Sequence, residues 1–249
     1  MISDNLLTKT LDYFDKHKNE REVVKPSLPI LYFGDLDAYQ KSELKIITVG
    51  KNPSDNEFRL NKEEPFSFIR FPKWCSKQRN LIKALNPYFE HKPLQWFSCF
   101  EPILNGATAS YYQKKGYSNI ALHTDICSPL ATNPTWSKLS PETQKLLFTD
   151  GFEIWKQLVN ELQPDIIFVS IPIKLFKDAF KPNSQGQLLI EFKYKKDGTP
   201  RKKPYRVELF EYTLNNKKKV KVVFGQAANT PFGTISDKQK NEIGELCLK

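Results

Sequence analysis

One short segment constrains the fold of this chain most strongly. Residues 165–170 place four consecutive apolar side chains, Ile-Ile-Phe-Val, directly after a Gln163-Pro164 break. A short, fully apolar strand of this kind is typical of the centre of a parallel sheet, where both faces are buried. Further strands are predicted at residues 44–49, 119–123 and 219–224, and helices at 3–19, at 140–162 after the Ser140-Pro141 start, and after Ser236-Asp237. Strands that alternate with helices predict an α/β fold, a three-layer α/β/α sandwich around a mostly parallel sheet.

The length and composition predict one globular domain over residues 1–249. The 249 residues are 39% hydrophobic and 27% charged, which is ordinary for a protein that buries a single core. No apolar run approaches the roughly 20 residues of a membrane span, and the N-terminus lacks the features of a secretory signal. We therefore expect a cytoplasmic monomer with no membrane partner.

The cysteines and histidines give no metal-binding pattern. Cys75, Cys99, Cys127 and Cys247 are widely separated, whereas metal sites commonly use closely spaced ligand pairs. His17 and His91 stand among polar residues and are expected to be exposed. We predict neither a metal nor a cofactor.

Positive charge is concentrated near the C-terminal third of the chain. Residues 188–213 alternate apolar and charged side chains around Lys196-Asp197-Gly198, which predicts a hairpin within a basic insertion at 188–221. Residues 191–221 hold eleven basic and four acidic residues, a net +7 of the chain's +10. Such a patch either attracts a polyanion through counterion release or only keeps the hairpin soluble. In the first case the DNA-binding residues are Lys202, Lys203, Lys217, Lys218 and Lys219, and the partner is double-stranded DNA.

Polar motifs follow the predicted strands. In α/β folds the functional site lies at the carboxyl ends of the parallel strands, so the loops after Val49, His123, Ser170 and Phe224 should converge on one cleft. Three of these loops carry distinctive sequences: Gly50-Lys51-Asn52-Pro53-Ser54, then His123-Thr124-Asp125-Ile126-Cys127-Ser128-Pro129-Leu130, then Gly225-Gln226-Ala227-Ala228-Asn229-Thr230.

In this order, and over the chain from about residue 30 to its end, the three motifs resemble those of the uracil-DNA glycosylase superfamily. The first is similar to the G-x-N-P-G water-activating loop, the second to the H-N-Y-C-P-L segment whose asparagine reads the flipped base, and the third to the H-P-S-P loop. The resemblance implies a monofunctional DNA glycosylase that flips a base and hydrolyses its glycosidic bond, leaving an abasic site. It assigns Asn52 to positioning the water. The third loop lacks the family's histidine and has Gln226 in its place, so Gln226 or Asn229 is expected to supply a neutral donor that stabilises the leaving base.

Two departures from the family pattern bear on the choice of base. Uracil-specific members carry a tyrosine beside the C5 position of the base, where this chain has the small Ser54. Asp125 replaces the base-reading asparagine, and an ionised carboxylate only accepts hydrogen bonds, which suits the N4 amine of cytosine. A protonated Asp125 would instead mimic the amide. The two residues together predict a C5-substituted cytosine, best matched by glucosylated hydroxymethylcytosine in phage DNA, and hence an anti-phage role.

Aromatic residues complete the predicted site. Phe58 and Phe66, together with Phe68, offer a stacking face for the flipped base, and His123 either binds the base or is structural. Phe232 either inserts into the duplex or belongs to the core.

Other functions remain open at this point. One is uracil or mismatch excision in DNA repair, and another is a non-catalytic nucleic-acid-binding relative. A nucleotide-metabolising enzyme would need a glycine-rich phosphate loop, which the sequence lacks.

Overall fold

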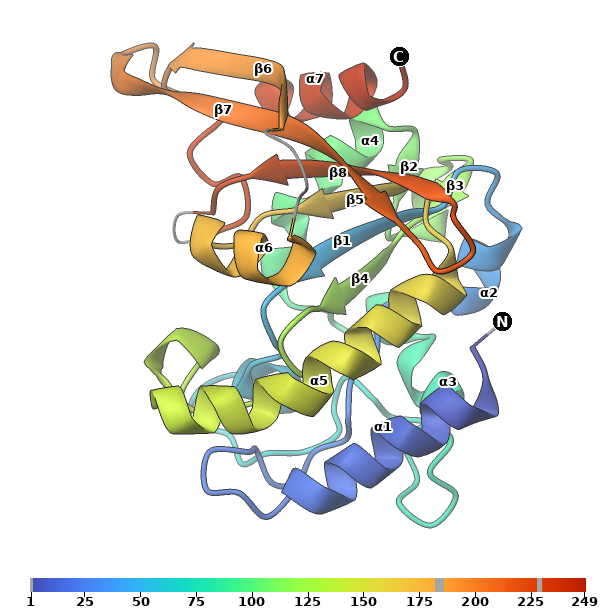
Figure 1. Cartoon of the computed structure of the whole chain (residues 1–249). Coiled ribbons are helices and arrows are strands. Elements are labelled where there is room, and N and C mark those ends of the chain that lie inside the picture. The colour runs from blue at the N-terminus through green and yellow to red at the C-terminus, as the bar shows by residue number, and fades with distance from the viewer. Residues whose placement is uncertain (1, 182–185, 228–229) are drawn as a thin grey trace. The chain divides into compact units, whose positions relative to one another are not determined.

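The computed structural model describes residues 2–181, 186–227 and 230–249, and the chain divides into two compact units. Unit 1 comprises residues 1–40, 51–94 and 122–162, and unit 2 comprises residues 41–50, 95–121 and 163–249. Figure 1 shows the elements of both units in chain order.

Unit 2 contains a mixed sheet with a parallel centre. Its strands lie in the order β1 (Ile46–Gly50), β5 (Ile166–Val169), β8 (Lys219–Gly225), β7 (Pro200–Thr213) and β6 (Gln187–Tyr194). The first three strands are parallel, and β7 and β6 extend the sheet antiparallel. Every residue of β5 is buried, as its unbroken apolar sequence predicts. A separate two-stranded parallel sheet joins β2 (Ala109–Ser110) to β3 (Asn119–Ile120).

The helices of unit 2 are α4 (Glu101–Gly106), α6 (Ile173–Phe180) and α7 (Asp237–Cys247), with 3-10 turns η3 (Gln95–Cys99) and η4 (Gln113–Lys115). The α4 and α7 helices approach so closely that their contact requires glycine. A Cβ atom on Gly106 would lie 2.0 Å from the Asn241 carbonyl oxygen, and one on Gly244 would lie 2.2 Å from that of Ile103. Both distances are far inside van der Waals contact, so side chains there would force the helices apart.

Unit 1 consists of helices and long loops around one strand. Its elements are α1 (Asp4–His17), α2 (Leu36–Lys41, which ends at the unit boundary), η1 (Asp55–Phe58), α3 (Leu81–Leu85), η2 (Tyr88–Glu90), β4 (Leu122–Asp125), η5 (Trp136–Lys138) and α5 (Pro141–Leu162). The Tyr13 hydroxyl of α1 donates to the Leu147 carbonyl of α5 at 2.7 Å and lies 3.0 Å from the Ser128 hydroxyl. These buried hydrogen bonds fix α1 against α5 and against the segment that follows β4.

An aromatic cluster forms part of the core of unit 1. The Tyr88 ring lies 4.8 Å from the Phe33 ring and 5.6 Å from the Phe71 ring, and Phe71 lies 5.6 Å from Phe58, all between centroids. All four side chains are at most 1% exposed. The cluster therefore supports residues 54–71, which contain little regular structure of their own.

The structure confirms the α/β class, the N-terminal helix, the helix predicted at 140–162, the closing helix and the hairpin. The closing helix begins with a capping box between Ser236 and Gln239. The single strand predicted at 119–123 is wrong, because the chain forms β3 and β4 with a break at Ala121. The Ala121 amide donates instead to the Ser110 carbonyl, at 2.9 Å.

His17 is not exposed, contrary to the expectation from its polar neighbours. It is 1% exposed, because it follows Tyr13 by one helical turn and shares the buried face of α1, with the two rings 4.8 Å apart. Neither ring nitrogen has a hydrogen-bond partner among the described residues, and burial lowers the pKa of the imidazole.

Within residues 2–181, 186–227 and 230–249, each helix is too short or too polar to cross a bilayer.

Candidate functional site

The segments that follow β1 and β4 are hydrogen-bonded to each other within unit 1. The Cys127 amide donates to the Lys51 carbonyl at 2.7 Å, and the Thr132 amide donates to the Pro53 carbonyl at 3.3 Å. An isolated parallel bridge pairs Ser54 with Thr132. The first two sequence motifs, more than 70 residues apart in the chain, therefore lie side by side, as their positions after two strands predict.

Asn52 is fixed at this junction through its amide nitrogen. Nδ2 donates to the Thr132 hydroxyl at 2.9 Å, to the Leu130 carbonyl at 3.4 Å and to the Pro53 carbonyl at 2.8 Å. The side chain is partly exposed. Because all three bonds use the donor atom, the acceptor Oδ1 is oriented without taking part in them. An amide held in this way can align a water molecule.

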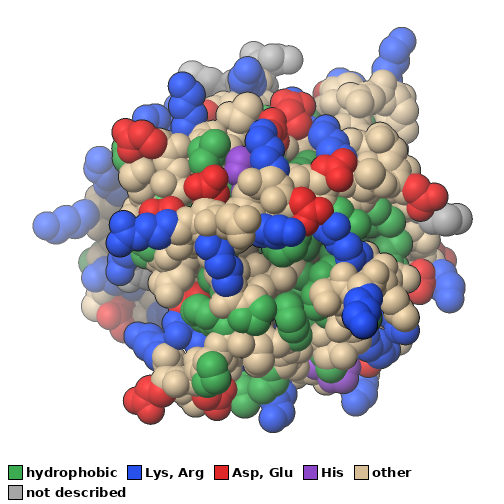
Figure 2. Space-filling model, turned by 90° about the horizontal axis from the view of Figure 1, so that it is seen from below, with side chains coloured by type: hydrophobic (Ala, Val, Ile, Leu, Met, Phe, Trp, Pro, Cys, Tyr) green, Lys and Arg blue, Asp and Glu red, His purple; other side chains and the backbone are tan. Residues whose placement is uncertain are grey.

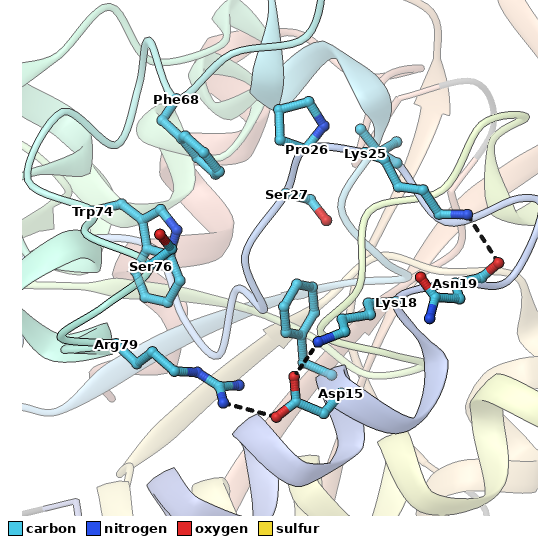
Figure 3. Close-up of a pocket in the computed structure, with 12 residues that line it drawn as sticks. Asp15, Lys18, Asn19, Lys25, Pro26, Ser27, Phe68, Trp74, Ser76 and Arg79 are labelled. Carbon is cyan, nitrogen blue, oxygen red and sulfur yellow. Dashed lines mark hydrogen bonds and ion pairs between the residues drawn. The ribbon is translucent and has the colours of Figure 1, made fainter.

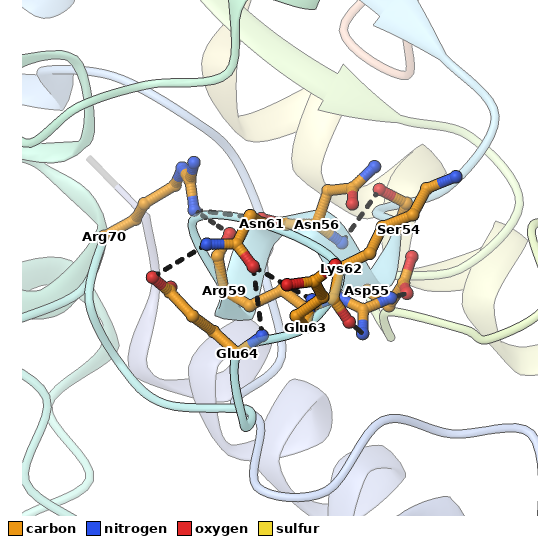
Figure 4. A network of polar contacts seen from close by, with 9 residues as sticks. All are labelled: Ser54, Asp55, Asn56, Arg59, Asn61, Lys62, Glu63, Glu64 and Arg70. Carbon is orange, nitrogen blue, oxygen red and sulfur yellow. Dashed lines mark hydrogen bonds and ion pairs between the residues drawn. The ribbon is translucent and has the colours of Figure 1, made fainter.

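Ser54 has a structural role that its small size allows. Its hydroxyl accepts from the Asn56 amide at 3.3 Å and so caps η1. The following loop, residues 54–70, is held by a polar network (Figure 4). Arg59 pairs with Asp55, and Arg70 Nη1 donates to the backbone carbonyls of Asn56 at 2.9 Å and Arg59 at 2.7 Å.

His123 and Asp125 project from the same side of β4. Their Nε2 and Oδ1 atoms are 3.6 Å apart, and both side chains are almost fully buried. Thr124, between them, faces the other way and accepts a hydrogen bond from Trp155 of α5 at 3.1 Å. This alternation places the predicted base-reading residue beside the histidine.

Glu57, which the sequence analysis did not select, is a buried acid next to this pair. It is 3% exposed and accepts a hydrogen bond from the Tyr88 hydroxyl at 2.6 Å. The pKa of Glu57 is raised to about 8, mainly by burial and to a smaller extent by the charge of Asp125, against the lowering effects of Tyr88 and Arg70. Glu57 is therefore mainly protonated at neutral pH. A single carboxylate in a short 3-10 turn has no periodicity by which the sequence would reveal its burial.

The predicted stacking residues differ in accessibility. Phe58 is 0% exposed and packs on Phe71, so the prediction that it offers a face to a flipped base is wrong for this conformation. Phe66 is partly exposed, with the Arg59 guanidinium 4.9 Å from its centroid. Phe68 is also partly exposed and lies edge-on to Phe58 at 6.1 Å.

The loops after β5 and β8 are joined within unit 2. The Ser170 hydroxyl donates to the Gly225 carbonyl at 2.8 Å and accepts from the Phe232 amide at 2.9 Å. The Gln226 side chain is exposed, and its backbone carbonyl accepts from the Tyr205 hydroxyl at 3.0 Å. Asn229 lies outside the described residues.

Phe232 belongs to the core. Its side chain is 0% exposed and packs edge-on against Phe100 at 6.1 Å. A buried ring is not available to enter a duplex, so the wedge interpretation is wrong for this conformation and the core interpretation holds.

The basic segment does not form one patch. In β7, Val207 pairs with Gly225, the last residue of β8, so residues 200–206 extend past the carboxyl end of that strand. Lys202 and Lys203 are exposed on this extension, and a cavity of about 380 Å³ near its tip is lined by Lys195, Lys196, Asp197, Arg201 and Thr234. Thr213 pairs with Lys219, the first residue of β8, so Lys217, Lys218 and Lys219 lie at the opposite, amino end.

The expectation that these three lysines form one patch with Lys202 and Lys203 is therefore wrong. A strand as long as β7 separates its two ends by roughly 40 Å. Lys218 also pairs with Asp165 at 2.6 Å, and Lys219 with Glu211 at 2.5 Å. On the face seen in Figure 2, basic side chains are similarly interspersed with acidic ones.

No protein-family model matches the chain, and no curated protein matches it. Among the described residues, no three His, Cys, Asp or Glu side chains are grouped so that they could hold a metal ion.

The raised pKa of Glu57 predicts a specific dependence of stability on pH. Between about 4.5, the ordinary value, and about 8, folded Glu57 keeps a proton that the unfolded chain loses. The free energy of unfolding should therefore fall across this window as the pH rises, by a few kcal/mol. Glu57→Gln, which is neutral throughout, should remove this component in denaturant unfolding measured at about pH 5, 7 and 9.

Glu63→Gln is the matched control, because Glu63 is an exposed acid of the same loop. If the two variants show the same pH dependence as the wild type, Glu57 does not titrate as a buried acid.

Proposed function

We propose that this chain is a DNA glycosylase that flips a modified pyrimidine out of DNA and hydrolyses its N-glycosidic bond, leaving an abasic site. The observation that carries the proposal is the junction in unit 1, where the oriented amide of Asn52 and the segment led by Asp125 are hydrogen-bonded together. The proposal includes the three-layer, uracil-DNA-glycosylase-like form of the α/β fold.

The oriented amide fits the chemistry of the reaction. The bond between C1′ and the base nitrogen breaks with its electron pair leaving on the base, and a water oxygen bonds to the oxocarbenium-like C1′. Oδ1 of Asn52 accepts a hydrogen bond from this water and aims its oxygen at C1′. An amide is a weak base, so its contribution is alignment, and the water proton passes to solvent or to the departing base.

The choice of base rests on Asp125 and Ser54. A carboxylate at position 125 accepts a hydrogen bond from the exocyclic amine of cytosine, whereas uracil presents a carbonyl oxygen there. The short side chain of Ser54 leaves space beside C5. We accordingly propose a C5-substituted cytosine, such as the glucosylated hydroxymethyl form, as the substrate and defence against phage DNA as the role.

Buried ionisable groups favour an enzyme over a non-catalytic binding protein. Asp125 and Glu57 are at most 9% exposed, and the charge of Asp125 contributes to the raised pKa of Glu57. Burying two carboxyl groups costs stability, and such clusters are enriched at catalytic sites.

The test uses duplexes that contain uracil, 5-hydroxymethylcytosine or its glucosylated form, with abasic sites detected by alkaline strand cleavage. Excision of a substituted cytosine would support the proposal. Excision of uracil alone would favour a repair glycosylase, and binding without cleavage would favour the non-catalytic alternative.

Asn52→Ala should lower single-turnover cleavage by roughly two orders of magnitude and leave DNA affinity nearly unchanged, because only the alignment of the water is lost. Thr132→Val, which removes the one side-chain anchor among the three acceptors of the amide but keeps the amide itself, should lower cleavage by a smaller factor. Wild-type rates in Asn52→Ala would exclude this residue from the mechanism.

Asp125→Asn should weaken excision of the substituted cytosine by roughly tenfold or more, because the charge-assisted contact to the amine is lost. Weak activity on uracil should appear, since the new amide can donate to its O4. Ser54→Tyr should block only the C5-substituted base, and Ser54→Ala controls for the loss of the η1 cap. A wild-type protein that prefers uracil would contradict this assignment.

The two ends of β7 provide a paired test of DNA binding. Changing Lys202 and Lys203 to Gln should reduce the slope of log affinity against log salt by about one unit per lost phosphate contact. The same change at Lys217 and Lys219, which alters charge equally at the other end, should leave the slope unchanged. If both pairs of changes reduce the slope equally, the net charge of the chain determines DNA binding, and not the position of Lys202 and Lys203 in the hairpin.

A further inference from the structure

A pocket of about 470 Å³ lies in unit 1, between the C-terminal end of α1, residues 24–27 and residues 68–79 (Figure 3). Its volume is in the range of sites for small organic ligands. Apart from Phe68, which the sequence analysis counted among the stacking rings, no residue of its lining belongs to the predicted excision site or to the hairpin.

One side of the pocket is aromatic. Phe68 and Trp74 stand next to each other, with centroids 6.4 Å apart and planes inclined at 49°. Phe14 of α1 also lines the pocket. Two rings inclined at this angle cannot sandwich a planar ligand between them, so the ligand would stack on the face of one ring.

The remaining lining is mainly cationic and polar. Arg79 and Lys18 both bind the carboxylate of Asp15, at 2.7 Å and 2.8 Å, and their hydrogen bonds hold the pKa of Asp15 below its ordinary value. Lys25, exposed on the opposite side from Trp74 in Figure 3, donates to the Asn19 carbonyl at 2.9 Å. Three cations surround one neutralised acid, so the pocket favours an anion.

We propose that this pocket binds a nucleoside phosphate. The base stacks on Phe68 or Trp74, and the phosphate is held by Lys25 with help from Lys18 and Arg79. Aromatic rings that stack on bases, combined with cations that hold phosphates, are how proteins bind the nucleotides of a single strand without a sequence preference. The nucleotide is either a free mononucleotide or one residue of a nucleic-acid strand, since both present the same base and phosphate.

The pocket borders the candidate site through one ring. Phe68, which lines the pocket, packs edge-on against Phe58, the residue after Glu57. A ligand on Phe68 would thus be separated by that one ring from the aromatic cluster that supports residues 54–71. The inference does not require base excision, because it concerns binding alone.

The experiment titrates the full chain separately with deoxyadenosine monophosphate, deoxyadenosine and inorganic phosphate. Isothermal titration calorimetry measures the binding of each ligand. The nucleotide should bind more tightly than either fragment. Trp74→Leu and Lys25→Gln should each raise its Kd by about tenfold, equivalent to about 1.4 kcal/mol. Lys9→Gln, the same charge change at an exposed residue of α1, should have no effect.

A short single-stranded oligodeoxynucleotide distinguishes the two sources. If the pocket binds one residue of a nucleic-acid strand, Trp74→Leu and Lys25→Gln weaken oligonucleotide binding as well. If it binds a free mononucleotide, the two changes weaken only mononucleotide binding. The proposal is overturned if the wild type does not bind the nucleotide, or if Lys25→Gln, which changes only an exposed side chain, binds it as tightly as the wild type.

Discussion

The candidate site depends on the hydrogen bonds that join residues 51–54 to residues 127–132. Asparagine at position 52 suits this junction because its amide donates and accepts at once. Its nitrogen donates to the carbonyls of Leu130 and Pro53, where an aspartate would place a carboxylate oxygen against these two acceptors. The same contact that closes the junction therefore orients Oδ1, so that structure and proposed catalysis require the same residue.

The protonation of Glu57, beside the junction, depends on where Arg70 directs its guanidinium. Arg70 is 4% exposed and directs Nη1 to the carbonyls of Asn56 and Arg59. It lowers the pKa of Glu57 only partly, and burial dominates. Glu57 is therefore neutralised mainly by a proton, which leaves Asp125 with less competing negative charge than two ionised carboxylates would create.

The regular elements could be predicted from sequence because each had a local signal. The apolar run at 166–169 predicted a buried strand, and Ser140-Pro141 predicted the start of α5. Glu57 and His17 could not be predicted, because their burial depends on which distant side chains cover them. That the loops after β1 and β4 lie together follows from their positions after two strands. By contrast, Phe232 was consistent with both core and surface, and Phe58 was predicted at a stacking face, until packing showed that both are buried.

The division of the basic segment shows why a count of charges does not locate a binding surface. Residues 191–221 carry a net charge of +7. Because β7 runs antiparallel to β8, the two ends of β7 lie at opposite ends of the strands. At the amino end, acids oppose two of the lysines, and each such pair cancels the far field of its members. Residues 200–206 extend past the end of β8, where the ladder supplies no partner strand on that side; Arg206 pairs with Glu191, whereas Lys202 and Lys203 are exposed. Strand direction and ion pairing, more than local composition, therefore determine which part of a basic segment remains available to a polyanion.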